Sequence, residues 1–190
     1  MTIYTKRMAL IAVLLLFSCK DNTKTGIEVQ PAGKVSIEAE KAITTAPAGF
    51  ESEDEVVDGW LRAGVDEKTV TDKLGMEYEA GVGEISQVNG MYWQEWDYPD
   101  NGVTLLMESE NAESQKSVIQ ITLYKPSRLQ TSRGIAIGSS VGDVRKAYAD
   151  VINNKESSGQ SIVAGSIYSG VIFTIADNAV SEIFIGAAAE

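Results

Sequence analysis

The stretch that decides the fold is GVDEKTVTDKLG at residues 64–75, because a version of it returns 74 residues later as GSSVGDVRKAYA at residues 138–149. Each version begins with glycine, and two positions on comes a side chain that caps helices well, Asp66 or Ser140. Apolar side chains then follow at i, i+4 spacing, so that they share one helix face: Val70 with Leu74, and Val144 with Tyr148. The pattern predicts two short helices, at 67–74 and 141–149, and an internal repeat.

Runs of β-branched and aromatic residues follow each predicted helix and are bounded by turn residues such as Asn89-Gly90 and Asn101-Gly102. They predict strands near 84–88, 91–97, 103–109 and 117–124 in the first half, and near 161–168, 170–176 and 180–186 in the second. The predicted fold class is therefore α+β: a tandem repeat of a short helix plus an antiparallel β-meander. Repeat 1 spans 56–126 and repeat 2 spans 127–190.

This organisation resembles the tandem architecture of the β-lactamase-inhibitor-protein-like fold. Each half also resembles the small outer-membrane assembly lipoproteins of the SmpA/OmlA type, whose helix opens with Gly-x-[Ser/Thr]-x-x-x-Val; the matching residues are Gly138, Ser140 and Val144, and less closely Gly64, Asp66 and Val70. The resemblance covers about residues 60–186. It implies partner binding through a concave sheet or exposed loops, and it implies no catalysis. The secreted inhibitors join their halves with disulfides, which a chain with one cysteine does not form.

The N-terminus has the pattern of a lipoprotein signal peptide, at residues 1–18. Lys6 and Arg7 precede an apolar run at 8–17 that is too short for a bilayer, which needs roughly 20 residues. Leu16-Phe17-Ser18-Cys19 then resembles a lipobox. We expect cleavage before Cys19 and acylation of that cysteine, with palmitate or similar chains holding the protein to membrane lipid. The alternative is an ordinary signal peptide followed by an unrelated cysteine.

Residues 19–55 are expected to comprise the lipidated cysteine and a flexible tether, because they contain few large apolar side chains and no period. Lys20-Asp21-Asn22 resembles the export tag of surface lipoproteins in the Bacteroidetes. The expected location is the cell envelope, with the outer membrane favoured and the periplasmic or surface orientation left open.

The charge of the chain excludes some classes of partner. There are 16 basic and 27 acidic residues, a formal net charge of −11, and loss of Lys6 and Arg7 with the signal makes the mature chain about −13. No basic stripe exists to neutralise phosphates, so the sequence argues against nucleic acid. The acidic balance serves either solubility or attraction to a basic partner.

The chain has poor means for catalysis. It contains no histidine, and its single cysteine, Cys19, is assigned to lipid, so no catalytic residue and no cofactor are predicted. Gly138-Ser139-Ser140-Val141-Gly142 fits the Gly-x-Ser-x-Gly nucleophile elbow, but it lacks a base, and a turn glycine with an N-cap explains it more simply. No metal site is predicted, because Asp97, Asp100 and Asn101 lack the alternating frame of a calcium loop.

The segment MYWQEWDY at 91–98 supplies the candidate partner-binding residues: Tyr92, Trp93, Trp96 and Tyr98. On a strand Trp93 faces one way and the other three face the opposite way. The rings are either core, as Trp60 is expected to be, or an exposed binding patch.

The sequence favours a non-catalytic, lipid-anchored envelope protein that binds a protein partner. It would serve as an accessory subunit of an outer-membrane complex or, second, as an inhibitor of an extracytoplasmic enzyme. The alternative is a small-ligand or cell-wall-binding lipoprotein that uses the Tyr92–Tyr98 segment, and a serine hydrolase at Ser140 is a minor third hypothesis.

Overall fold

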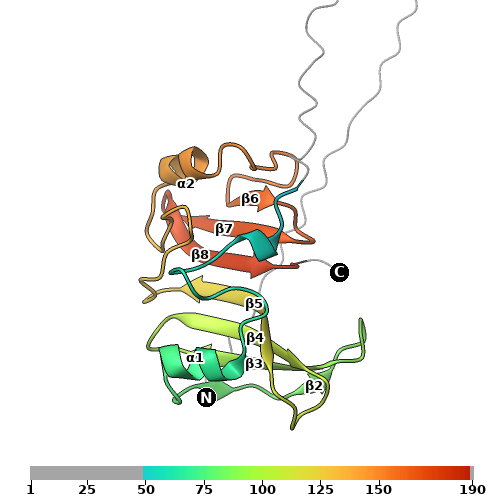
Figure 1. Ribbon diagram of the computed structural model, residues 1–190. Coiled ribbons are helices and arrows are strands. Elements are labelled where there is room, and N and C mark those ends of the chain that lie inside the picture. Colours follow the sequence, from blue (N-terminus) through green and yellow to red (C-terminus); the bar gives the residue numbers. More distant parts are fainter. Residues whose placement is uncertain (1–48, 189–190) are drawn as a thin grey trace, which may run out of the picture. The chain divides into compact units, whose positions relative to one another are not determined.

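The computed structural model describes residues 49–188, which form a mixed α+β structure with one antiparallel sheet of eight strands (Figure 1). The strands run along the sheet in the order β1-β3-β4-β5-β8-β7-β6, and β2 also pairs with β3. Their bounds are β1 Glu79–Ala80, β2 Glu84–Ile85, β3 Tyr92–Tyr98, β4 Val103–Ser109, β5 Ser117–Tyr124, β6 Ser161–Gly165, β7 Gly170–Ala176 and β8 Ala179–Gly186. The predicted α+β class is confirmed at this level.

The two helices begin at the predicted caps. Helix α1 spans Glu67–Leu74, as predicted, and the Asp66 carboxylate accepts a hydrogen bond from the Thr69 N–H at 2.8 Å. Helix α2 spans Val141–Ala147, and Ser140 forms a capping box with Asp143. It ends two residues before the predicted Ala149, because Tyr148 leaves the helical conformation at φ −111° and ψ 18°.

Most strands lie where the alternation placed them. Those at 103–109, 117–124 and 170–176 are confirmed. The one predicted at 91–97 lies one residue later, at 92–98, and the one predicted at 180–186 begins one residue earlier, at Ala179. Two strands are shorter than predicted. The one at 161–168 ends at Gly165, whose φ of 80° leads into a turn closed by the Ser166 N–H and the Ser169 carbonyl. The one at 84–88 ends at Ile85, and the short β1 was not predicted.

Each helix is joined to the last strand of its own half in the same way. The N–H of Gly64 donates to the Val118 carbonyl at 2.8 Å, and the N–H of Gly138 donates to the Val180 carbonyl at 2.8 Å. In each half the cap residue also forms an isolated bridge to the first residue of that strand: Asp66 to Ser117, and Ser140 to Ala179. The two glycines have positive φ values of 82° and 90°, which explains why the pattern begins with glycine in both places.

The sheet register also matches between the halves. β4 and β5 slip by a bulge between Leu106 and Met107, and β7 and β8 slip at the corresponding place, between Thr174 and Ile175. The halves meet where β5 pairs with β8 in the middle of the sheet.

That central pairing is reciprocal. Ile121 pairs with Ile185, and Leu123 pairs with Ile183. Because Ile121 and Ile183 hold equivalent positions in their halves, as do Leu123 and Ile185, each contact has its counterpart across the join.

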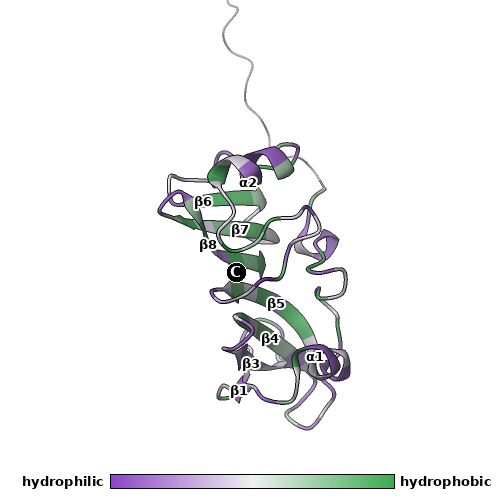
Figure 2. Ribbon diagram, turned by 90° about the vertical axis from the view of Figure 1, so that its left-hand side faces the viewer, coloured by the Kyte–Doolittle hydropathy of each residue, from purple (hydrophilic) through white to green (hydrophobic). Residues whose placement is uncertain are grey.

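The core lies between the sheet and the elements that cover one of its faces. Figure 2 shows α1 and the segment that leads into it on one side of the sheet. Val70 of α1 and Val144 of α2 are both fully buried in the same apolar cluster, and Trp60 packs against that cluster, as expected. The alternating burial along β4 shows the consequence: every second side chain is buried, and those between face away from the helices.

The folded part begins earlier than the predicted tether boundary at residue 55. Ser52–Asp54 form a 3-10 helix, η1, and η1 lies against β7 and β8. The Glu55 side chain is fully buried and accepts hydrogen bonds from the Tyr148 hydroxyl and the Ser132 N–H, both at 2.7 Å. This segment is polar in sequence, so only its long-range contacts with the second half reveal that it is ordered. We call residues 50–55 the strap.

Candidate functional site on the uncovered sheet face

The face of the sheet that points away from the helices, which we call the uncovered face, carries an unusual mixture of side chains. None of the eight strands contains a lysine or an arginine. The acidic residues of the strands all stand on the uncovered face, as the strand register shows: Glu79, Glu84, Glu95, Asp97, Glu108 and Glu182. Large apolar side chains lie among them: Trp93, Leu106, Tyr124, Ile172 and Phe184.

Two of these carboxylates hold aromatic groups in place. Glu108 accepts hydrogen bonds from the Trp93 indole N–H at 2.8 Å and from the Asn89 amide at 2.7 Å. Asp97 accepts one from the Tyr124 hydroxyl at 2.7 Å, and burial together with this neighbouring carboxylate raises the pKa of Tyr124 to about 12. Trp93 and Tyr124 are therefore held in place, which lowers the entropy that binding would cost at these two side chains.

The four aromatic residues singled out in the sequence do not form one patch. Trp96 and Tyr98 are 4% and 1% exposed, and the Tyr78 ring stacks on Trp96 with centroids 4.1 Å apart. Both rings belong to the core beneath the helix face, so they present no surface to a partner. This outcome corrects the hypothesis of a four-ring patch, because the alternation that separates Trp93 from the others also carries Trp96 and Tyr98 inward.

The remaining two aromatic residues of that segment are partly exposed and lie on opposite faces. Trp93 lies on the uncovered face. Tyr92 lies on the helix side, where the Nζ atom of Lys116 is 5.5 Å from the ring centroid. Of the four aromatic residues singled out in the sequence, Trp93 is therefore the one that lies partly exposed on the uncovered face.

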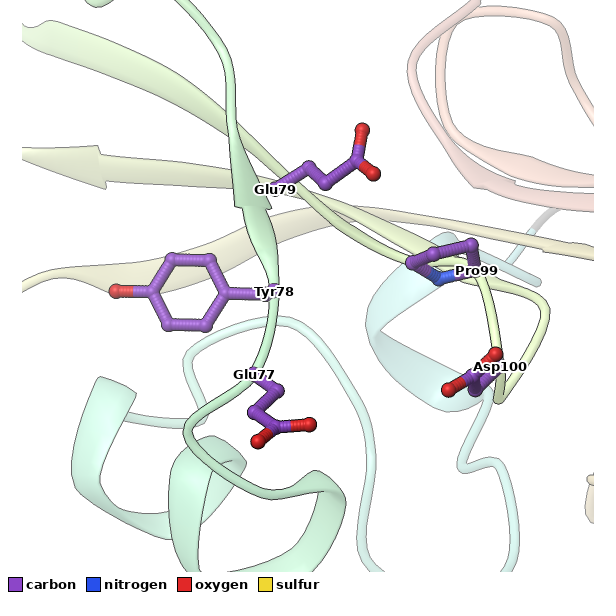
Figure 3. A pocket seen from close by; sticks show the side chains of 5 residues that line it. All are labelled: Glu77, Tyr78, Glu79, Pro99 and Asp100. Carbon is purple, nitrogen blue, oxygen red and sulfur yellow. The ribbon is translucent and has the colours of Figure 1, made fainter.

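A hollow of about 250 Å³ lies at the end of β1 (Figure 3). It is lined by Glu77, Tyr78, Glu79, Pro99 and Asp100. Figure 3 shows the Tyr78 ring pointing away from Pro99 and Asp100. In residues 49–188 no group of three or more histidine, cysteine, aspartate or glutamate residues is placed to hold a metal ion. The carboxylates of this hollow add to the acidic character of the first half.

The serine of the Gly-x-Ser-x-Gly match has a structural role. The Ser140 hydroxyl donates to an Asp143 carboxylate oxygen at 2.7 Å and accepts from the Asp143 N–H at 3.1 Å. The hydrogen bonds from Ser140 lower the pKa of Asp143 below its usual value. These are the contacts of a capping box at the start of α2.

Sequence reasoning missed a group of exposed apolar side chains in the first half. Val82, Ile85 and Val88 are 96%, 54% and 62% exposed, and they lie between β1 and β3. The available signal was the Gly81-Val82-Gly83 triplet, where an apolar side chain has no alternating partner. This triplet lies before the strand predicted at 84–88, so no predicted element included it.

Comparison with known proteins adds no relative. No family model matches the chain, and no curated protein and no solved structure matches it either. Within residues 49–188 no helix is long and apolar enough to cross a membrane. Cys19 and the predicted signal peptide lie outside the described residues.

Proposed function

We propose that this protein is a non-catalytic, lipid-anchored envelope protein that binds a protein partner through the uncovered face of its sheet. The observation that carries the proposal is the composition of that face, with six carboxylates, aromatic and aliphatic side chains among them and no basic residue in any strand. Flat apolar surface with a polar surround is typical of a protein interface.

The fold that we propose is a tandem repeat of the β-lactamase-inhibitor-protein-like type. The matched cap bridges, the matched bulges and the reciprocal β5–β8 pairing support it. A structure of this kind offers one continuous sheet for a partner to cover. Among partners, we rank a subunit of an outer-membrane complex first and an extracytoplasmic enzyme that the protein inhibits second.

The anchor in this proposal is the lipid on Cys19, with the residues between Cys19 and the strap as a tether. The strap supports this arrangement because it fixes the start of the described body: the Ser52 N–H donates to the Ser169 hydroxyl at 3.1 Å, and Glu55 is buried against Tyr148. A force along the tether would then act on the sheet through the strap, and not on a flexible terminus.

The alternative of a small-ligand or cell-wall-binding protein is weaker. It relied on the Tyr92–Tyr98 segment as a stacking platform, and two of its four aromatic side chains are buried. Trp93 alone offers a ring on the uncovered face in this segment.

An affinity pull-down of the lipidated protein from detergent-solubilised membranes tests the function. We expect a stoichiometric protein partner that is lost on a double charge reversal of Glu95→Lys and Glu182→Lys, both exposed on the uncovered face. The matched control is Glu110→Lys with Glu113→Lys, which changes the net charge equally in the exposed turn between β4 and β5. Recovery of free monomer alone, or equal loss with both pairs, would contradict the proposal.

A further inference from the structure

The exposed side chains of Val82, Ile85 and Val88 lie on a piece of chain that the second half lacks. Glu79 pairs with Asp97, and at the equivalent place the Asn153 N–H donates to the Val163 carbonyl at 2.8 Å. From there to the equivalent residues Glu95 and Ser161, the first half uses residues 80–94 and the second uses only 154–160. We call residues 81–91 the extension. Because the second half builds its strands without it, the fold itself does not require the extension.

The extension is ordered although its side chains are exposed. Strand β2 within it pairs with β3, the Gly81 N–H donates to the Glu95 carbonyl at 2.8 Å, and the Ser86 N–H donates to the Met91 carbonyl at 2.8 Å. A Cβ atom at Gly83 would lie 1.7 Å from the Tyr92 hydroxyl, so a larger residue would require the Tyr92 ring to move where the extension crosses it. A backbone held in this way presents Val82 and its neighbours at a fixed place, without a large ordering cost on binding.

A hollow of about 310 Å³ lies where the extension meets the uncovered face. Its apolar lining comes from Val82, Trp93 and Leu106, and two carboxylates, Glu84 and Glu95, lie at its side. The extension contains no lysine or arginine. A bound segment would therefore contact apolar side chains and two negative charges in the same hollow. The hollow lies next to an edge strand, β2, that pairs within residues 49–188 with β3 alone.

We propose that the hollow bounded by Val82, Trp93 and Leu106 is the anchoring point of the partner, and that the partner enters it with an extended basic segment. The matching segment has an apolar side chain with lysine or arginine two residues to either side, since alternate residues of a strand share one face. The partner's segment is oriented by pairing as an added strand along the edge of β2. This inference rests on the proposed function and names the chemistry of the partner at the same surface.

Charge complementarity distinguishes this occupant from a second copy of the chain. Two copies joined through the hollow would bring Glu84 and Glu95 of each together in a chain whose net charge is −11. Like charges brought together at an interface oppose association, whereas a basic segment pairs with them. The occupant is therefore a basic segment of a different protein.

The direct test is a titration of the ¹⁵N-labelled chain without its signal peptide with the peptide Ac-Lys-Thr-Leu-Thr-Lys-NH₂, followed by NMR. We expect shifts at the Trp93 indole N–H and at the Gly81 and Gly83 amides, weakening as salt is added. The control peptides replace both lysines by glutamate, or leucine by serine, and should shift these signals far less. Equal shifts with the glutamate peptide, shifts confined to the second half, or no shifts at millimolar peptide would overturn the proposal.

Variants separate the extension from the rest of the face. Val82→Ser with Glu84→Gln changes two exposed side chains and leaves the backbone pairing of β2 in place, so it should fold as the wild type does. We expect it to weaken peptide binding about tenfold, while Ile172→Ser, on the uncovered face of the second half, leaves peptide binding unchanged. Equal weakening by both variants, or no loss with Val82→Ser and Glu84→Gln, would overturn the proposal.

The same variant distinguishes this inference from the function on which it rests. In the pull-down from membranes, the Val82→Ser and Glu84→Gln protein should lose its partner. If this variant retains the partner while the Glu95→Lys and Glu182→Lys variant loses the partner, the partner binds the sheet face but not the extension, and only the inference fails.

Light scattering tests whether a second copy of the chain is the occupant. It should report a monomer, and a dimer that Val82→Ser abolishes would identify a second copy as the occupant and overturn the proposal.

Discussion

Trp93 and Trp96 stand three residues apart in β3 and have different surroundings. Trp93 lies on the uncovered face with its indole N–H bonded to Glu108, whereas Trp96 is 4% exposed and stacked under Tyr78. We expect Trp96→Ala to lower the free energy of unfolding by about 3–5 kcal/mol, the usual cost of removing a buried ring. Trp93→Ala should cost much less and instead abolish partner binding. Urea denaturation and the pull-down together measure this. Equal stability losses would show that Trp93 is core as well.

Tyr98 is a buried residue whose hydroxyl has no hydrogen-bond partner among the described residues. Burial raises its pKa to about 12, above the ordinary value of 10. The folded state favours the neutral phenol, whereas the unfolded state ionises at the ordinary pKa of 10. The free energy of unfolding therefore keeps its full value below pH 10 and falls as the pH rises toward 12.

Tyr98→Phe should therefore be at least as stable as the wild type at pH 7, since it removes an unsatisfied buried group. It should also lose less stability between pH 10 and 12. Urea midpoints across that range measure the effect. Tyr124, whose pKa is also raised to about 12, remains in both proteins and provides the common background. A variant that is less stable at pH 7, or equally steep above pH 10, would contradict this account.

At the scale of elements, the strap shows how a segment without sequence periodicity becomes part of the core. Glu55 is fully buried, and the Tyr148 hydroxyl donates a 2.7 Å hydrogen bond to it. The burial of Tyr148 raises the pKa of its hydroxyl most, and the neighbouring Glu55 carboxylate raises it further. The Arg133 guanidinium lies over both the Phe50 and the Tyr148 rings, at 5.4 and 4.8 Å from their centroids. The strap thus joins the start of the described chain to α2 by polar contacts that depend on one another.

We expect Tyr148→Phe to lower the free energy of unfolding by about 1–3 kcal/mol, because it leaves the buried Glu55 carboxylate without one of its donors. The matched control is Tyr168→Phe, which removes a hydroxyl from a tyrosine that is 62% exposed in the same half. Urea denaturation compares the two. If both variants unfold at the same concentration, Glu55 does not hold the strap in place through Tyr148.

What the sequence predicts about these elements depends on how local the cause is. The helix starts at Glu67 and Val141 follow from a cap and an i, i+4 pair within a few residues, so both were predicted. The strap and β1 depend on partners far along the chain, such as Tyr148 and Asp97, and no local period marks them. The site is predicted in part: the sequence identifies Trp93 as a candidate contact residue, but within the extension it predicts only a strand at 84–88 and a turn at Asn89-Gly90.

At the scale of the whole molecule, the sheet separates the strap, where the described chain begins, from the extension, where the partner is proposed to bind. The strap lies against β7 and β8, whereas the extension lies beyond β3, at the other end of the strand order (Figure 1). A protein held through its N-terminal side would therefore carry the extension on the half remote from its attachment. This placement fits the proposed lipid-anchored role, in which the partner lies away from the membrane.

The same continuous sheet predicts that the two halves unfold together. All three tryptophans, Trp60, Trp93 and Trp96, belong to the first half, so fluorescence follows that half alone, while far-ultraviolet circular dichroism follows both. Ile183 is fully buried in β8, where it pairs with Leu123 of β5. Ile183→Ala should cost about 2–5 kcal/mol, and the loss should reach the first half through that pairing. We expect the urea midpoints from fluorescence and from circular dichroism to fall by the same amount. A fluorescence midpoint that stays at the wild-type value while the dichroism transition splits in two would mean that each half folds by itself, with the β5–β8 join contributing little.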